Sequence, residues 1–274
     1  MASPALNPFN GIQGAISLKA MARDKKYKIA IIGKGKSGKS WFAASAPGSI
    51  MYYDFDERWM GLMEHKNIDN IQLKVMKERN QSKPSSIKSL ETDLSTFQAM
   101  KIKGQPVPDT YVFDTVTFMI QALEAEAFEA NKDLYRKVKM GNRELRVGAG
   151  WDYYRTIEAY IQYFMTEFSA LGNVIFVFHE KDEEDKTESS KERKAYTGQV
   201  TINPQFLITT LTLFNEVFRI EAITGVNDSV PTTYTVTCRP TGEVRASTTL
   251  LVDAKEPPDL MAMIAKSEAA RAKR

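Results

Sequence analysis

The sequence predicts an α/β protein whose core is a mostly parallel sheet flanked by helices, with late antiparallel strands. Residues 27–54 pass from an apolar strand through a glycine loop and a helix into a second strand, within about 30 residues. Further buried strands are expected at 110–114 and 173–178, and helical patterns at 118–131 and 151–170 lie between them. Strands that alternate with helices in this way are typical of a parallel sheet.

The remaining elements follow from weaker patterns. A helix is expected over 89–100, whereas the polar residues 64–88 show no assignable pattern. Late in the chain we expect strands over 215–222, 232–238 and 248–252, some of them antiparallel.

The chain has 274 residues, which suits one large α/β domain, or one domain with a small appendage. We divide it into an N-terminal arm (1–26), a core (27–252) and a basic C-terminal tail (253–274) expected to form a short helix. The arm is rich in small and polar residues but carries Phe9 and Ile12. It is therefore either a contact that holds subunits together or a disordered end.

Composition excludes several classes of protein. Cys238 is the only cysteine, so no disulfide can form within the chain. With only two histidines, His65 and His179, a Cys/His zinc site is also excluded. The net charge of +3 is too small to indicate nucleic acid by itself. No apolar run reaches the roughly 18 residues of a membrane helix, and no signal peptide pattern is present, so we expect a cytoplasmic protein with no membrane partner.

The glycine loop after the first strand is a complete Walker A motif, or P-loop. Its glycines let backbone N–H groups approach a triphosphate closely, and the following helix start adds further donors. The motif lysine reaches the β- and γ-phosphates, and the final serine ligates Mg²⁺. ATP with Mg²⁺ is the expected ligand, and the residues of the loop are Gly33, Lys34, Gly35, Lys36, Ser37, Gly38, Lys39 and Ser40.

Polar residues follow the other buried strands. Asp114 ends its strand where a P-loop protein needs a carboxylate to orient the ligands of the metal. Strand alternation places Asp54 and Asp56 on one face, and Asp56 is the candidate for positioning the attacking water, with Glu57 as the alternative. His179 follows the strand at 173–178, at the edge where ligands bind, and is a candidate phosphate sensor. The alternative for each of these residues is that it has no role in the reaction and is an ordinary residue of a turn or a cap at the end of a strand.

Together the four strand-end motifs, at 33–40, 54–57, 112–115 and 176–180, resemble the core of RecA-like ATPases in order and spacing. More closely the chain resembles the compact phage ATPases of the Sak-four type, relatives of the RecA and RadA recombinases. The similarity covers roughly residues 27–252. It implies a Mg²⁺-dependent ATPase, stimulated by single-stranded DNA, that acts in annealing or strand exchange in the host cytoplasm.

The resemblance also suggests roles for single residues. Asp56 falls where RecA-like proteins place the catalytic glutamate, so an aspartate is a departure that bears on the rate of hydrolysis. His179 and Glu180 fall where these proteins place a polar sensor before the second DNA-binding loop. Residues 181–194 carry mixed charge instead of the glycines of that loop.

Residues 132–146 follow the helix after Asp114, where RecA-like proteins place their first DNA-binding loop. This stretch holds six basic residues against two acidic ones. Alone, such a run is also typical of a solvated loop. With the resemblance it predicts phosphate contacts and a stacking aromatic for single-stranded DNA. The candidate DNA-binding residues are Tyr135, Arg136, Lys137, Lys139, Arg143 and Arg146.

The resemblance further implies a homo-oligomer, either a ring or a filament, because RecA-like cores usually bind nucleotide at a subunit boundary. Arg245 is our candidate for a cation donated in trans to the phosphates. A single-stranded DNA-binding protein is a further candidate partner.

Two other functions fit the same motifs. In a P-loop kinase for a small molecule or nucleotide, residues 132–146 would form a lid that clamps the phosphates. In an ATP-switched assembly factor, such as a helicase loader, hydrolysis would be slow and a partner protein would be required.

Overall fold

The computed structural model describes residues 25–78, 83–140, 143–148, 150–180, 211–223, 231–240 and 246–273. The expectations for the arm at 1–24, for the segment 181–194 and for Arg245 therefore concern parts of the chain outside the described residues.

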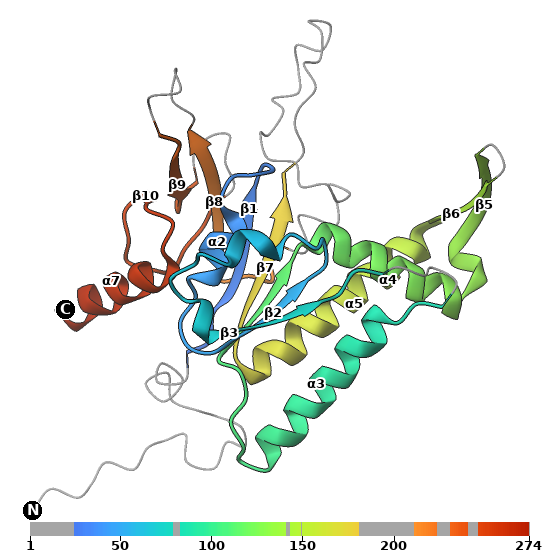
Figure 1. The fold of residues 1–274 in the computed structure, drawn as a ribbon, viewed down its shortest axis with the longest axis horizontal. Coiled ribbons are helices and arrows are strands. Elements are labelled where there is room, and N and C mark those ends of the chain that lie inside the picture. The colour runs from blue at the N-terminus through green and yellow to red at the C-terminus, as the bar shows by residue number, and fades with distance from the viewer. Residues whose placement is uncertain are drawn as a thin grey trace, which may run out of the picture.

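An eight-stranded sheet forms the centre of the molecule, in the order β10-β9-β8-β1-β7-β4-β2-β3 (Figure 1). Six neighbouring strands run parallel, and the last two pair antiparallel at one edge, which confirms the predicted fold class. The strands are β1 (Lys28–Gly33), β2 (Ile50–Asp54), β3 (Ile71–Val75), β4 (Thr110–Asp114), β7 (Asn173–His179), β8 (Glu216–Ile223), β9 (Thr233–Thr237) and β10 (Lys255–Glu256).

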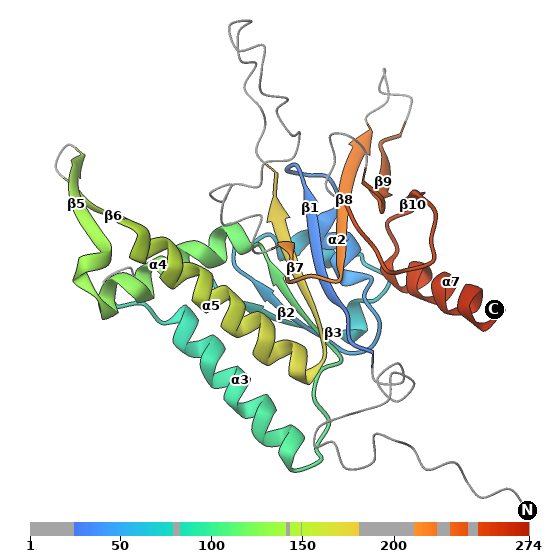
Figure 2. The ribbon, with the colours of Figure 1, turned by 180° about the vertical axis from the view of Figure 1, so that it is seen from behind.

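Helices cover both faces of this sheet. One face is covered by α3 (Ser86–Ile102), α4 (Val116–Ala130) and α5 (Gly150–Leu171), and the other by α2 (Lys39–Ala44) and α7 (Leu260–Ala272). Figure 2 shows the first group of helices from the reverse side. Short 3₁₀ turns are η1 (Trp59–Leu62), η2 (Ile68–Asn70) and η3 (Lys132–Leu134).

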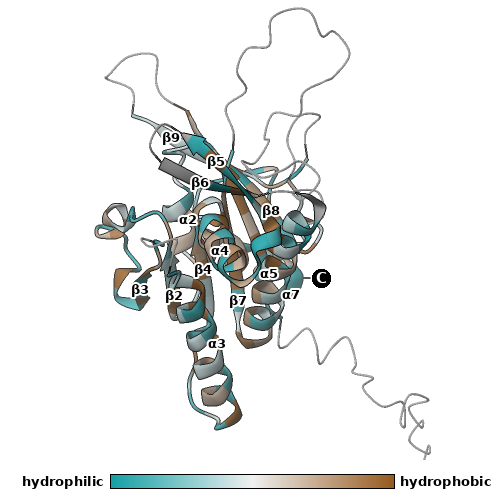
Figure 3. Ribbon diagram, turned by 90° about the vertical axis from the view of Figure 1, so that its right-hand side faces the viewer, coloured by the Kyte–Doolittle hydropathy of each residue, from teal (hydrophilic) through white to brown (hydrophobic). Residues whose placement is uncertain are grey.

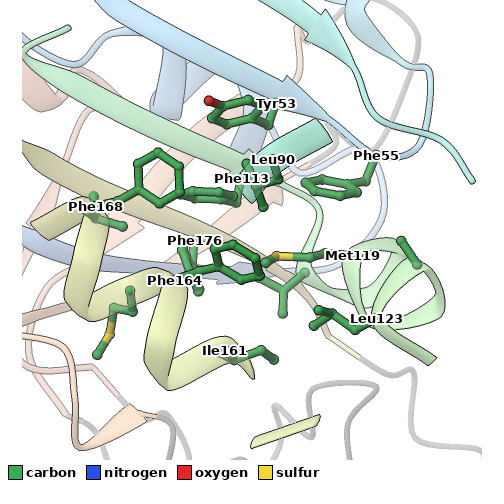
Figure 4. Packing of buried hydrophobic residues seen from close by; sticks show 14 of the residues in the cluster. Tyr53, Phe55, Leu90, Phe113, Met119, Leu123, Ile161, Phe164, Phe168 and Phe176 are labelled. Carbon is green, nitrogen blue, oxygen red and sulfur yellow. The ribbon is translucent and has the colours of Figure 1, made fainter. Parts of the chain in front are cut away.

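The central strands β1, β4 and β7 are largely apolar because both faces of the sheet are buried there. In β4, Tyr111 and Phe113 face the α3–α5 layer, while Val112 faces the α2 layer. Phe113 packs between Phe168 and Phe176, with ring centroids 5.2 and 4.7 Å away (Figure 4). This aromatic layer fixes the position of the strand that ends at Asp114.

The end of the chain differs from expectation in one strand. Residues 248–252 form no strand, and only an isolated bridge joins Val217 to Ser247. The buried carboxylate of Glu216 takes the donors instead, because the hydroxyls of Thr248 and Thr249 and the backbone N–H of Thr249 all donate to it. These bonds replace a ladder of strand hydrogen bonds.

The segment set apart as a tail packs on the core. Glu256 of β10 pairs with Val236 of β9, and Leu260, Met263 and Ile264 of α7 are buried in the core layer that contains α2. The boundary drawn at residue 253 therefore falls within continuous packing. In the described part of the chain, none of the helices combines the length and apolar character that a bilayer span requires.

The basic segment after α4 has more structure than its sequence indicated. It forms a two-stranded antiparallel hairpin of β5 (Tyr135–Met140) and β6 (Arg143–Gly148), in which Lys137 pairs with Arg146. The hairpin projects from the body on the side opposite α7 (Figures 1 and 2). In Figure 3, which faces this side, hydrophilic residues (teal) lie along β5.

Candidate functional site

The P-loop connects the carboxyl end of β1 to the start of α2. Gly33 is required by close approach, because a Cβ there would lie 2.5 Å from the carbonyl oxygen of Ile220 and 2.6 Å from Ser37 Oγ. Gly38 has φ of 87°, a left-handed conformation that favours glycine, immediately before α2 begins. Lys34 and Lys36 are exposed. The loop therefore has the tight, backbone-lined form that a phosphate cradle needs.

A cavity of about 570 Å³ opens beside this loop. The sheet edge brings together residues from distant parts of the sequence, because the carboxyl ends of parallel strands meet there. The cavity is lined by Lys36, Ser37, Gly38, Lys39, Ser40, Trp41, Asp56, Arg58, Gly61, Leu62, Asp114, Thr115, His179, Tyr234 and Pro258.

Asp114 lies at the floor of this cavity and is almost completely buried. Its Oδ2 accepts hydrogen bonds from Ser40 Oγ, at 2.5 Å, and from the hydroxyl of Tyr52. Its Oδ1 is buried and has no hydrogen-bond partner among the described residues. Burial raises the pKa of Asp114, and the hydrogen bonds from Ser40 and Tyr52 oppose that rise.

This arrangement fits a magnesium ion. Hydroxyl and carboxylate oxygens are the ligands that Mg²⁺ takes in nucleotide sites, and the unpartnered Oδ1 of Asp114 is a buried acceptor that lacks a cation or a donor. Ser40 and Asp114 would hold the ion directly or through its water ligands. Bound there, Mg²⁺ would neutralise charge on the phosphate oxygens.

Lys39 is buried at the base of the same cavity, with 5% of its surface exposed. Its ammonium group donates a hydrogen bond across the loop to the carbonyl oxygen of Lys34. Burial lowers the pKa of Lys39 to about 8, although the nearby carboxylates of Asp114, Glu180 and Asp56 oppose the change. An anionic ligand would restore the favourable environment for its charge.

The turn after β2 gives different surroundings to the two aspartates that strand alternation placed on one face. Asp54 is buried and its carboxylate accepts the backbone N–H groups of Asp56 and Trp59, each at 3.0 Å. Asp54 therefore supports the turn and does not line the cavity. Burial raises the pKa of Asp54, and a hydrogen bond between its carboxyl group and that of Asp56 adds to the rise, while the backbone N–H of Asp56 opposes it.

Asp56 reaches the cavity, whereas Glu57 does not line it. Asp56 Oδ2 lies 3.5 Å from Arg58 Nε and 3.9 Å from His179 Nε2. Burial acts to raise the pKa of Asp56, but hydrogen bonds with His179 and Asp54 and the charge of Arg58 outweigh it and lower the pKa. Glu57 instead forms an ion pair with Lys77, at 2.7 Å.

His179 and Glu180 lie beside the P-loop because β7 and β1 are parallel neighbours. His179 pairs in register with Gly33, and the backbone N–H of Glu180 donates to the carbonyl oxygen of Gly33 at 2.9 Å. The buried carboxylate of Glu180 is held by Arg219 of β8, with 3.0 Å from Nη2 to Oε1. The end of β7 is thus fixed on both sides, and His179 lines the cavity.

Four further residues lie around this site that no sequence motif singled out. Arg58 stands four residues after Asp54 and could have been noticed as a cation in the strand-end motif. Trp41 follows the Walker serine directly. Tyr234 and Arg219 come from late strands, and no local pattern connects them with the P-loop.

The candidate DNA-binding residues are divided between the base and the exposed part of the hairpin. Tyr135 is half-buried against Phe128, with ring centroids 5.1 Å apart, and the guanidinium of Arg146 covers its ring at 5.1 Å. Arg146 also lies 3.6 Å from Glu129. The stacking face expected of Tyr135 is therefore occupied by Arg146.

The other basic residues of β5 lie at the surface of the hairpin. Arg136, Lys137 and Lys139 are exposed. The side chain of Arg143 lies outside the part of the chain that the structure describes. Within the described residues, none from the hairpin lines the cavity.

Comparisons with known proteins give a family and a distant structural likeness. A family model described as an AAA domain matches residues 25–242, which is more than half of the chain. No curated protein matches. Among solved structures, the crystal structure of flagellar accessory protein FlaH from Methanocaldococcus jannaschii is similar, at 12% identity and a TM-score of 0.39. That match covers 77% of this chain and 76% of the FlaH chain, and a likeness this weak carries no functional argument.

The buried lysine predicts a pH dependence of phosphate binding. Lys39 has a lowered pKa of about 8, so the free protein loses this positive charge as the pH rises through about 8. Affinity for a triphosphate is expected to be full below that pH and to fall by up to about tenfold per pH unit above it. Titration calorimetry at a series of pH values measures this directly.

The matched control is Lys39→Arg, because a guanidinium stays charged throughout this range. The affinity of this variant for a triphosphate is expected not to decline as the pH rises above about 8, whatever its absolute value. A decline of the same size in Lys39→Arg would assign the titration to another group.

Proposed function

The chain belongs to the AAA domain family, and on that premise we propose that it is a Mg²⁺-dependent ATPase acting on single-stranded DNA in annealing or strand exchange. The observation that carries the ATPase part is the buried Asp114 carboxylate, whose Oδ2 is bonded to Ser40 and whose Oδ1 has no partner among the described residues. The DNA part rests on the resemblance to phage recombination ATPases and on the exposed basic residues of the hairpin.

The proposed reaction assigns each cavity residue a task. Backbone N–H groups of the loop hold the phosphates, and Lys39 moves from the carbonyl of Lys34 to the terminal phosphate. Asp56 orients the attacking water and accepts its proton, while Arg58 and His179 hold the carboxylate in place. The oxygen of that water forms a bond to the γ-phosphorus as the bond to the β,γ-bridging oxygen breaks.

Two observations bear on the alternatives. A kinase lid would have to reach the phosphates, and none of the described hairpin residues lines the cavity. An assembly factor with little hydrolysis needs no water-positioning group, and Asp56 reaches the cavity with two cationic or hydrogen-bonding partners. The first observation supports an ATPase over a kinase with a hairpin lid, and the second supports an active ATPase over an assembly factor with little hydrolysis.

For assembly we propose a homo-oligomer, a ring or a filament, with Arg245 as the cation donated by a neighbour and a single-stranded DNA-binding protein as a further partner. Arg58 already supplies an arginine to the cavity from the same chain. A cation donated by a neighbour would therefore be a second positive charge near the phosphates, in addition to Arg58. A specific ATPase rate that does not change with protein concentration would contradict assembly-dependent catalysis.

The central test is ATP turnover with Mg²⁺, measured with and without single-stranded DNA. We expect turnover that rises when DNA is added and falls by orders of magnitude in Lys39→Ala, because that change removes the cation at the transferred phosphate. A folded Lys39→Ala protein with normal turnover would contradict ATP hydrolysis at this site. Turnover that is the same with and without DNA would contradict only the DNA part of the proposal.

The carboxylate assignment predicts different effects for two neighbouring residues. Asp56→Asn is expected to lower kcat by about 10²-fold or more while the dissociation constant for ATP changes little, because water positioning acts in the transition state. Glu57→Gln is the matched control, since Glu57 pairs with Lys77 and does not line the cavity. Steady-state kinetics that show the reverse pattern would assign the water to Glu57.

The hairpin assignment predicts a change in salt dependence. Reversing Arg136, Lys137 and Lys139 to glutamate is expected to weaken single-stranded DNA binding and to reduce the slope of log K against log salt by about 2, since about 0.7 counterions are released per phosphate contact. ATP binding without DNA is expected to persist. Fluorescence anisotropy of a labelled oligonucleotide at several salt concentrations gives both numbers.

The control for overall charge reverses three exposed lysines away from the hairpin, Lys83, Lys103 and Lys255. It changes the net charge by the same amount as the hairpin variant. Equal loss of DNA affinity in both variants would show that DNA contact does not depend on the hairpin.

A further inference from the structure

The cavity beside the P-loop has two chemically different parts. One part holds the loop, the two cavity carboxylates and the cations that suit a phosphate chain. The other part has no role in phosphate chemistry, and it is lined by Trp41, Gly61, Leu62, Tyr234 and Pro258. Two large, partly exposed aromatic side chains in the lining of a polar site indicate a planar ligand that stacks on them.

Tyr234 lies directly against the phosphate loop. A Cβ added at Gly38 would lie 3.0 Å from Tyr234 Cδ1 and 3.5 Å from Cε1, so the phenol ring rests on the residue just before α2. The ring comes from β9, where Tyr234 pairs with Ala222 of β8. It remains 42% exposed, so part of the ring is still open to a ligand.

Trp41 is held in place by its neighbours. It stands in the first turn of α2, 39% exposed, and packs edge-on against His65 at 4.6 Å between ring centroids. His65 is buried, and its Nδ1 accepts the backbone N–H of Asn67 at 3.1 Å. The side-chain amide of Asn67 in turn donates to the carbonyl oxygens of Ala44 and Ala46. The indole of Trp41 is therefore supported by the hydrogen-bonded pair of His65 and Asn67 before any ligand binds.

Among the described residues of this aromatic part, the only side-chain groups that could hydrogen-bond to a nucleobase are the indole N–H of Trp41 and the hydroxyl of Tyr234. Among the described lining residues there, no side chain carries a carboxamide, a carboxylate or a basic group. The backbone N–H of Gly61 is already donated to the carbonyl oxygen of Arg58, at 3.4 Å. Stacking on an aromatic ring is available to every base, because every base has a π face.

We propose that Trp41 and Tyr234 form a base subsite that binds a nucleoside triphosphate by stacking, with little discrimination between adenine and guanine. The inference rests on the proposed triphosphate site and specifies which part of the nucleotide the remaining cavity takes. The phosphates bind at the loop, and the base contacts the aromatic side chains next to it. GTP then binds nearly as tightly as ATP, and tripolyphosphate binds more weakly than either.

The test is equilibrium binding of ATP, GTP and inorganic tripolyphosphate to the full chain, by titration calorimetry with Mg²⁺ present. The wild-type chain is expected to bind ATP and GTP with dissociation constants within about fivefold of each other. Trp41→Ala and Tyr234→Ala are each expected to weaken both nucleotides by about 10- to 100-fold, and to leave tripolyphosphate within about threefold. Trp41→Phe and Tyr234→Phe keep a ring and are expected to recover most of the affinity.

Tyr163→Ala is the matched control, because Tyr163 is a similarly exposed aromatic on α5 outside the cavity. The subsite is overturned if both alanine variants bind ATP normally, if tripolyphosphate weakens as much as ATP, or if the wild-type chain prefers one base by more than about 100-fold. A wild-type chain that binds tripolyphosphate as tightly as ATP overturns the subsite and leaves the phosphate loop intact. A chain that binds none of the three overturns the proposed function as well.

Discussion

The carboxylate of Asp114 is the point on which the site depends. It is removed from water at the end of β4, where its Oδ2 takes the hydroxyls of Ser40 and Tyr52 and its Oδ1 takes no donor from the described residues. A buried carboxylate is costly unless its oxygens are satisfied, so the aromatic layer around Phe113 must hold this strand end firmly against α2. The cost is acceptable where a cation completes the group, which is the arrangement that a magnesium site provides.

Parallel pairing explains why the other site residues lie close to this carboxylate. β1 and β7 are in register from Lys28 to Gly33, so His179 lies beside the P-loop, and β2 pairs with β4 so that Asp54 lies beside Asp114. The chain must then turn away from Asp54, and the backbone N–H groups that Asp54 accepts direct Asp56 into the cavity. One carboxylate supports the turn and the next serves the site.

The sequence was informative where a local pattern corresponds to a local structure. The apolar strands and the P-loop could be predicted because both faces of the sheet are buried and because phosphate binding needs glycines at fixed spacing. Asp114 followed from its place at a strand end. The hairpin could not be predicted as strands, since its basic residues hide the alternation, and the expected strand at 248–252 failed because Glu216 takes its donors. Tyr234 lies in the strand expected over 232–238, but its position at the P-loop could not be predicted, because only the pairing of β9 with β8 brings it to Gly38.

Charge within the cavity accounts for the remaining features of the site. Its lining carries three cations, Lys36, Lys39 and Arg58, against the carboxylates of Asp56 and Asp114. Burial alone disfavours the charge on Lys39, which is why its pKa is lowered to about 8. A triphosphate is still anionic after it has bound Mg²⁺, so it stabilises all three cations at once, while the metal relieves Asp114. Binding of a metal-bound triphosphate therefore removes two electrostatic costs, the buried positive charge of Lys39 and the buried carboxylate of Asp114. Because the phosphates relieve the first cost and the metal relieves the second, the site favours the metal-bound triphosphate over either component alone.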